Sequence, residues 1–229
     1  MDVKKHFGKG LQFDGYYSRS KSIDDNSRNV EGVVIQNSYD IAGDRGLSDF
    51  DARNRFVVSG IYALPFEHNI ITRGWQLSLI ETLQSGNPLN FHTSTTTFTG
   101  EGTLRPNVTG NVITGYTPAY NGSALFQGFI QNPSVFVNQG AAFGDLGRNV
   151  IIGPGFQNLD FAIVRNIRIH EGLNFQIRGD AYDIFNHPNF SSPTTTIGSA
   201  TLGLIGATRT TSGDFGSSRQ IQLAMKLQF

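Results

Sequence analysis

Apolar and polar residues alternate along the last segment of the chain. Between residues 219 and 229 every second side chain is apolar, and glutamine, lysine or alanine fills the positions between them. Successive side chains of a β-strand point to opposite faces of the sheet, so this pattern predicts a strand with one apolar face. About nine to eleven residues also suffice for a tilted strand to cross a bilayer. The apolar positions are Ile221, Leu223, Met225, Leu227 and Phe229.

Five further segments repeat this alternation, and long polar connections alternate with short ones between them. Outer-membrane barrels are built in this way, with long loops outside and short turns in the periplasm. We therefore predict an all-β fold, an antiparallel up-and-down transmembrane β-barrel segment of about six long strands with long outer loops and short periplasmic turns. The predicted strands span residues 8–22, 54–64, 74–85, 157–169, 172–185 and 219–229.

The two faces of these strands predict different surroundings. The apolar face is expected to contact lipid, and the polar face to line a lumen. Glu81 and Arg165 interrupt the apolar face, so each lies either close to a membrane interface or next to a bulge. The predicted lumen-facing residues are Gln76, Arg178, Asp180, Gln222 and Lys226. Aromatic residues near strand ends predict a girdle at the membrane interfaces, formed by Tyr17, Tyr62, Trp75 and Phe185.

Composition narrows the chemistry. The chain has 229 residues and no cysteine, which excludes disulfides and thiol catalysis. Lysine and arginine balance aspartate and glutamate, so no nucleic-acid partner is expected. We found no catalytic constellation and no histidine spacing typical of a metal site, and we expect neither an enzyme nor a cofactor nor a metal. A calcium site at Asp24–Asp25 or at Asp49 and Asp51 is disfavoured, because the Asp-x-Asp-x-Asp-Gly pattern is missing.

Two functions fit the alternating strands. The first is a barrel in the outer membrane of a Gram-negative bacterium, in contact with its lipid. The alternative is a soluble secreted β-sandwich binding module, whose apolar faces would cover a shared core. Alternating loop lengths and a terminal aromatic residue favour the barrel. With four apolar positions in phase before it, Phe229 is typical of the signal by which the barrel-assembly machinery recognises a last strand through edge pairing.

Several stretches, in this order along the chain, resemble the barrel region of Oar-like TonB-dependent receptors of the acidobacterial type. They include G-L-Q-F-D-G-Y-Y-S-R-S-K-S-I-D-D (Gly10–Asp25), R-G-L-S-D-F-D-A-R-N-R-F-V-V-S-G-I-Y-A-L-P-F (Arg45–Phe66), L-R-P-N-V-T-G (Leu104–Gly110), G-D-L-G-R-N (Gly144–Asn149) and A-Y-D-I-F-N-H-P-N-F (Ala181–Phe190). The resemblance spans almost the whole chain and implies uptake of a small ligand, driven through TonB.

The same resemblance implies a larger barrel, of about twenty-two strands around an N-terminal plug. No plug, TonB box or signal peptide is recognisable in this sequence. We therefore expect residues 1–229 to form the C-terminal portion of an outer-membrane barrel, with Lys4–Lys9 in a periplasmic turn. The TonB complex would be contacted only through the missing N-terminal region, and the ligand is left open.

Overall fold

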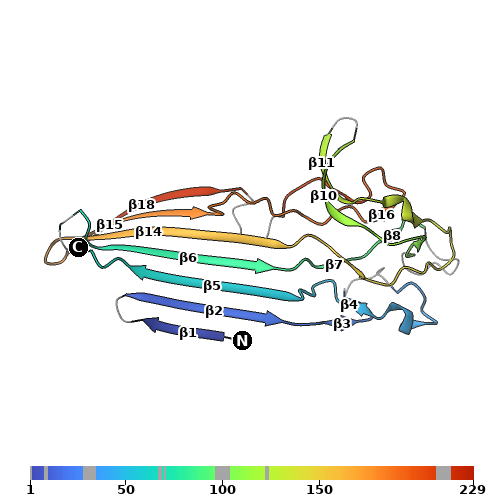
Figure 1. Cartoon of the computed structure of the whole chain (residues 1–229), viewed down its shortest axis with the longest axis horizontal. Helices are drawn as coiled ribbons and strands as arrows, with labels where there is room; N and C mark the ends of the chain where they lie inside the picture. The colour runs from blue at the N-terminus through green and yellow to red at the C-terminus, as the bar shows by residue number, and fades with distance from the viewer. Residues whose placement is uncertain are drawn as a thin grey trace.

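A computed structural model describes residues 2–7, 10–27, 35–66, 69, 71–95, 104–121, 124–209 and 218–229. Its dominant feature is a single long antiparallel sheet (Figure 1). The short turns and the C-terminus lie at one end of this sheet, and the long loops gather at the other end. The predicted alternation of long outer loops and short periplasmic turns is therefore confirmed.

The long sheet contains seven strands in the order β1-β2-β5-β6-β14-β15-β18, each antiparallel to its neighbours. The six predicted strands are confirmed, most of them to within a few residues. The strands are β1 (Asp2–Phe7), β2 (Leu11–Arg19), β5 (Asn54–Ala63), β6 (Trp75–Gln84), β14 (Phe156–His170), β15 (Leu173–Tyr182) and β18 (Gln220–Gln228).

Two boundaries differ from the prediction. The expected turn at Lys4–Lys9 is wrong for its first part, since Asp2–Phe7 forms β1, which pairs with β2; residues 8 and 9 lie outside the described residues. With four charged or histidine side chains among six residues, β1 carries too weak an alternation to be recognised alone. The predicted strand 172–185 ends at Tyr182, because Asp183 and Asn186 have φ angles of 46° and 53°, which an extended strand does not allow.

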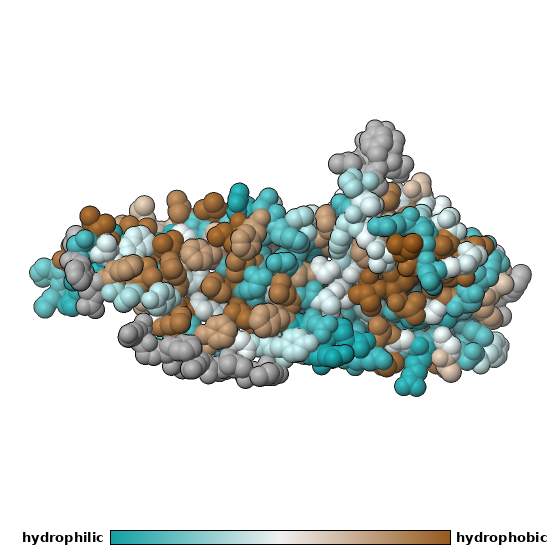
Figure 2. All heavy atoms as spheres, in the orientation of Figure 1, coloured by the Kyte–Doolittle hydropathy of each residue, from teal (hydrophilic) through white to brown (hydrophobic). Residues whose placement is uncertain are grey.

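The register places the apolar positions of six strands on one continuous face. Paired residues of antiparallel strands share a face. Leu79, for example, lies opposite Gly60 on one side and Phe161 on the other, and Ile177 lies between Arg165 and Met225. Figure 2 shows hydrophobic residues gathered over the long strands and in a separate patch on the outer end. A one-residue slip in any strand would reverse its faces, so the shared pattern fixes the register.

Two charged residues, Arg165 and Glu81, lie on this face. Arg165 pairs with Trp75, the first residue of β6, and its guanidinium carbon is 5.3 Å from the centroid of the indole ring. Glu81 lies three residues from the outer end of β6 and is hydrogen-bonded by the Gln157 side chain. The β6–β14 register is unbroken along its length. The unbroken register excludes a bulge at either charge between β6 and β14; that both lie close to the interfaces, which would avoid the cost of about 2–4 kcal/mol for arginine at the bilayer midplane, stays a prediction.

The long loops fold into a compact layer at the outer end, which we call the cap (residues 20–27, 35–53, 85–95, 104–121, 124–155 and 183–209). Short strands pair within it: β3 (Ile23–Asp24) with β4 (Gly46–Leu47), β7 (Pro88–Leu89) with β13 (Ile151–Ile152), β8 (His92–Thr93) with β16 (Thr196–Ile197), and β9 (Asn107–Val108) with β12 (Phe136–Val137). A three-stranded sheet joins β10 (Thr114–Asn121), β11 (Ala124–Ile130) and β17 (Leu204–Ile205).

The hydrophobic core lies in the cap and not in the long sheet. Phe91 and Phe136 stack at its centre with ring centroids 4.7 Å apart. The buried members of the core are Leu89, Phe91, Phe129, Ile130, Phe136, Leu146, Ile151, Ile197 and Ile205. The cap also holds two short 3₁₀ helices, η1 (Ile41–Asp44) and η2 (Pro133–Val135). No helix in the described part of the chain is long and apolar enough to cross a membrane.

We predict that neighbouring positions on β6 differ in their surroundings. The chain has no cysteine, so single Ser78→Cys and Leu79→Cys variants can each carry a nitroxide label. In outer membranes the label at residue 79 should be relaxed by oxygen, which concentrates in lipid, and the label at residue 78 by a water-soluble nickel chelate. Equal responses at the two positions, measured by electron paramagnetic resonance, would contradict the assignment of the apolar face to lipid.

Candidate functional site

The polar face of the long sheet is the first candidate site. Cross-strand pairs place Gln76, Val164 and Arg178 in one row and Asp180 beside Gln222 in another, while Lys226 pairs with Gln176. All five predicted lumen-facing residues therefore share one face, opposite to the apolar one. That this face lines a lumen stays a prediction.

An ion pair lies at the centre of this polar face. The Arg178 Nε donates to both carboxylate oxygens of Asp180, at 2.9 and 2.8 Å. The two residues are two apart on β15 and so point the same way. The Asp180 side chain is 10% exposed and the Arg178 side chain 51% exposed. The aspartate thus anchors a guanidinium that presents its remaining donors to the space in front of the sheet.

The four predicted girdle residues lie at two levels. Tyr17 is near the outer end of β2, and its hydroxyl donates to Asn54 Oδ1 at 2.8 Å. Tyr62 and Trp75 are near the turn end, where the indole Nε1 donates to the Ile71 carbonyl oxygen at 3.0 Å. Phe185 follows β15 in an exposed turn at the outer end, so its predicted place within the strand is wrong. Their role as a girdle stays a prediction.

The predicted assembly signal occupies an open edge of the sheet. Its first four residues, Ile221 to Leu227 in steps of two, face Ala181, Gly179, Ile177 and Phe175 across the ladder. Phe229 follows the last residue of β18 and is fully exposed. Among the described residues β18 pairs only with β15, and β1 only with β2. Both edges therefore offer backbone groups to a further strand.

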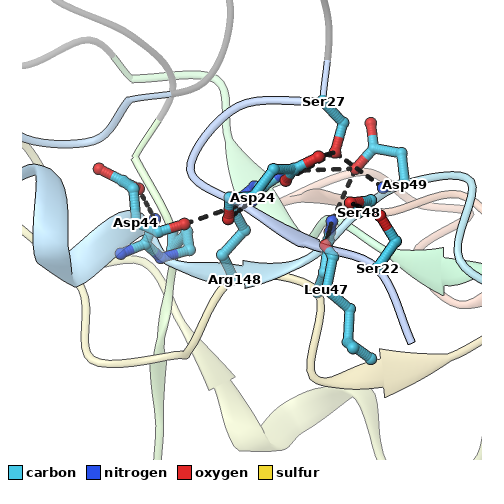
Figure 3. Close-up of polar contacts among 10 residues, drawn as sticks. Ser22, Asp24, Ser27, Asp44, Leu47, Ser48, Asp49 and Arg148 are labelled. Carbon is cyan, nitrogen blue, oxygen red and sulfur yellow. Dashed lines mark hydrogen bonds and ion pairs between the residues drawn. The ribbon is translucent and has the colours of Figure 1, made fainter.

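Arg148 connects the first two long loops in the cap (Figure 3). Its side chain is fully buried, and its guanidinium donates to the backbone oxygen of Asp24 at 2.9 Å and to Ser27 Oγ at 2.6 Å. Its Nη2 also lies 2.7 Å from the Asp24 carboxylate. Gly46 passes so close that a Cβ there would lie 2.5 Å from the Arg148 carbonyl oxygen, so glycine is required. One buried cation thereby holds together chain segments far apart in sequence.

Hydrogen bonding fixes the charge of Asp24. Burial would raise the pKa of this carboxyl, but hydrogen bonds from Ser48, Arg148 and Ser27 outweigh it and hold the pKa below its ordinary value of 3.8. The neighbouring Asn149 adds to the contact by donating to the Leu47 carbonyl oxygen at 2.7 Å. The carboxylate therefore stays ionised opposite Arg148 at every pH above its depressed pKa.

Arg105 makes a second connection of the same kind. Its Nη1 is paired with the Asp44 carboxylate, and its Nε donates to the Leu146 carbonyl oxygen at 2.8 Å. Asp44 is 1% exposed and also accepts the backbone N–H of Gln36 at 2.9 Å. Gln36 in turn accepts the backbone N–H of Arg105 at 2.7 Å, which closes the network. Buried charges require such complete pairing.

Sequence reasoning missed both arginines as structural centres. They lie within two of the stretches that resemble the receptor family, Leu104–Gly110 and Gly144–Asn149. An isolated arginine between turn residues usually indicates a solvated loop, so only the recurrence of these motifs could have pointed to them.

The loop aspartates considered for calcium bind protein donors instead: Asp49 accepts from Asn149, and Asp51 from the Ser22 N–H. In the described part of the chain no group of three or more metal-binding side chains gathers.

A cavity of about 340 Å³ opens in the cap near the polar face. Arg209 lines it, its guanidinium carbon 5.9 Å from the centroid of the Phe156 ring and its Nη2 donating to Asn87 Oδ1 at 2.8 Å. Phe156 pairs with Gln84, which lies on the polar face of β6. Ser191 and other hydroxyl side chains of the third loop complete the wall. The cavity combines one cation with hydroxyl groups, which suits a small polar ligand.

We predict that Arg148→Ala lowers the free energy of opening the cap by about 3 kcal/mol. This is the low end of the cost of breaking a buried ion pair, because Asp24 is 23% exposed. Substitution of the exposed Arg45 by alanine should change this free energy of opening by less than about 0.5 kcal/mol. Because the folded pKa of Asp24 is depressed, its contribution is complete above pH 3.8 and is lost as pH falls through the lower folded value. Hydrogen exchange at Gly46 to Ser48 measures both effects. Unchanged hydrogen exchange in the Arg148→Ala variant would refute the predicted loss of cap stability. The Asp24→Asn variant should show no increase in exchange as the pH falls.

The fold and the cap can be compared with known proteins. A family model described as outer membrane beta barrel domain matches residues 1–222. Among curated proteins and among solved structures, none matches the chain significantly. The match and the single long sheet contradict the alternative of a soluble β-sandwich, which needs two sheets packed face to face. The chain therefore belongs to the outer membrane beta barrel domain family, and its place is the outer membrane of a Gram-negative bacterium.

Proposed function

We propose that this outer-membrane barrel is a receptor that takes up a small ligand, driven from the inner membrane through TonB. The proposal is one of transport and not of catalysis. The folded cap carries it: two buried arginine networks and an apolar core hold the outer loops in one arrangement beside the polar face. A receptor needs such preorganised loops, because loops that order only on binding reduce affinity. The resemblance to Oar-like TonB-dependent receptors is the reason for proposing TonB as the source of energy.

The route of the ligand follows from the polar groups. The Arg209 cavity at the outer end would receive it, and the Arg178–Asp180 pair further along β15 would face its passage. Within the described residues, each site presents a guanidinium with one hydrogen-bonded side-chain partner and further donors available. A ligand with carboxylate or hydroxyl groups matches these donors. In lipid the edges of β1 and β18 must also be paired by further strands, since unpaired backbone groups are too costly there.

The uptake test uses the bacterium that produces the protein. We expect wild-type cells to deplete at least one small polar solute from the medium, measured by mass spectrometry, while cells that lack the protein do not. Arg209→Ala should slow that depletion about tenfold, the cost of one charge-assisted hydrogen bond, while exposed Lys21→Ala has no effect.

A protonophore provides the control for the energy source. It should abolish the depletion, because TonB draws on the inner-membrane gradient. Depletion that continues with the protonophore would indicate a passive pore and overturn the TonB proposal. Equal depletion by cells without the protein would overturn the transport proposal itself.

The barrel-assembly machinery is the proposed partner of β18. We expect Phe229→Ala to lower the amount of protein in the outer membrane several-fold, since the terminal aromatic residue is exposed and makes no contribution to a folded core. Lys226→Ala, on the opposite face of the same strand, is the matched control and should leave the amount unchanged. Quantitative immunoblots of membrane fractions measure both. Equal amounts in the two variants would remove the assembly signal.

A further inference from the structure

A second cavity, of about 340 Å³, lies where the apolar face of the long sheet meets the cap. Phe56, Leu83 and Gln157 line it from three adjacent strands and are aligned by the register, Phe56 opposite Leu83 and Leu83 opposite Gln157. Leu83 points to the same face of β6 as Leu79, which lies four residues earlier in the strand. Gln84 and Phe156, which belong to the polar face, also line the cavity, so it lies at the outer end of the sheet and reaches the membrane side through Phe56, Leu83 and Gln157.

Its height matches the outer membrane interface. The strand residues that line it are among the first of β5 and β14 and the last of β6, beside the Tyr17 hydroxyl bonded to Asn54. Glu81 lies just below, hydrogen-bonded by Gln157. Polar and apolar side chains meet at this level, as headgroups and acyl chains do in the adjoining leaflet.

The cap supplies the remaining wall through Tyr116 of β10. Its ring packs against Phe129 and Phe190, with centroids 5.6 and 5.3 Å away, so the cap core fixes its position. Burial raises the pKa of the Tyr116 hydroxyl, which therefore remains a neutral donor and acceptor. His187 stands on the same rim. The wall thus has an aromatic base and a rim of amide, hydroxyl and imidazole groups.

We propose that this cavity binds a glycolipid of the outer leaflet. One alkyl chain lies against Phe56, Leu83 and the Tyr116 ring, and the sugar hydroxyl groups bond to Asn54, Gln157 and His187. Amides and an aromatic ring suit neutral, hydroxyl-rich headgroups. An anionic headgroup fits poorly, because none of the described residues that line the cavity is a lysine or arginine and the Glu81 carboxylate is adjacent. The Arg209 cavity proposed for the transported ligand has a different lining and adjoins this site at Phe156.

The test uses an alkyl glucoside with a diazirine in its chain. The protein is purified from outer membranes in an amine-oxide detergent, irradiated with this probe, and mapped by mass spectrometry. We expect saturable labelling at Leu83 and Tyr116, displaced by unlabelled alkyl glucoside and not by an alkyl phosphocholine of the same chain length. Labelling at Leu79, on the same face in mid-membrane, should rise without saturation because it reports general lipid contact.

Two variants separate the parts of the site. Leu83→Trp fills the cavity while remaining apolar and should abolish the saturable labelling of Tyr116. Gln157→Leu should weaken labelling about tenfold through the lost amide contact, and Gln222→Leu on the polar face is its control. Labelling at Tyr116 that is absent, unsaturable or displaced equally by the phosphocholine would overturn the proposal. None of these results depends on uptake of the transported ligand.

Discussion

The pairing of backbone groups between neighbouring strands is the constraint on which this structure depends. Lipid offers no partner for an N–H or a carbonyl group, so each strand within the membrane must satisfy its backbone through its neighbours. The seven-stranded ladder does so along unbroken registers such as that of β6 with β14. Because the ladder also alternates side chains between two faces, the same pairing separates the lipid-facing surface from the polar one. Side-chain packing within the sheet has a minor part in this.

The cap, unlike the long sheet, is stabilised mainly by side-chain contacts. Its strands are mostly two residues long and contribute few ladder bonds, so an apolar core and buried ion pairs hold it together. The guanidinium groups of Arg105 and Arg148 donate hydrogen bonds to carbonyl and carboxylate oxygens of loop segments that form no regular sheet. Buried ion pairs give specificity more readily than stability. A cap that is defined in this way keeps the Arg209 cavity in one shape beside the polar face.

The long sheet could be predicted from the sequence, and most of the cap could not. Alternation over nine or more residues is a local signal, and it located β6, β14 and β18 well. β1 was missed because charged residues obscure its pattern, and Phe185 was placed in a strand because the left-handed Asp183 leaves no trace in hydropathy. The cap was predicted only as polar loops. Its contacts join residues as distant as Asp24 and Arg148, and no local period reports such pairings.

The contact of Arg148 with Asp24 also imposes an order on biogenesis. Asp24 reaches the outer side on the connection between β2 and β5, and Arg148 reaches it on the connection between β6 and β14, 124 residues later. The two connections lie at the same end of the sheet once β2, β5, β6 and β14 are paired in this order. Closure of the cap therefore depends on the pairing of these strands, so a surface protease or antibody that distinguishes open from closed loops would report on assembly of the sheet below.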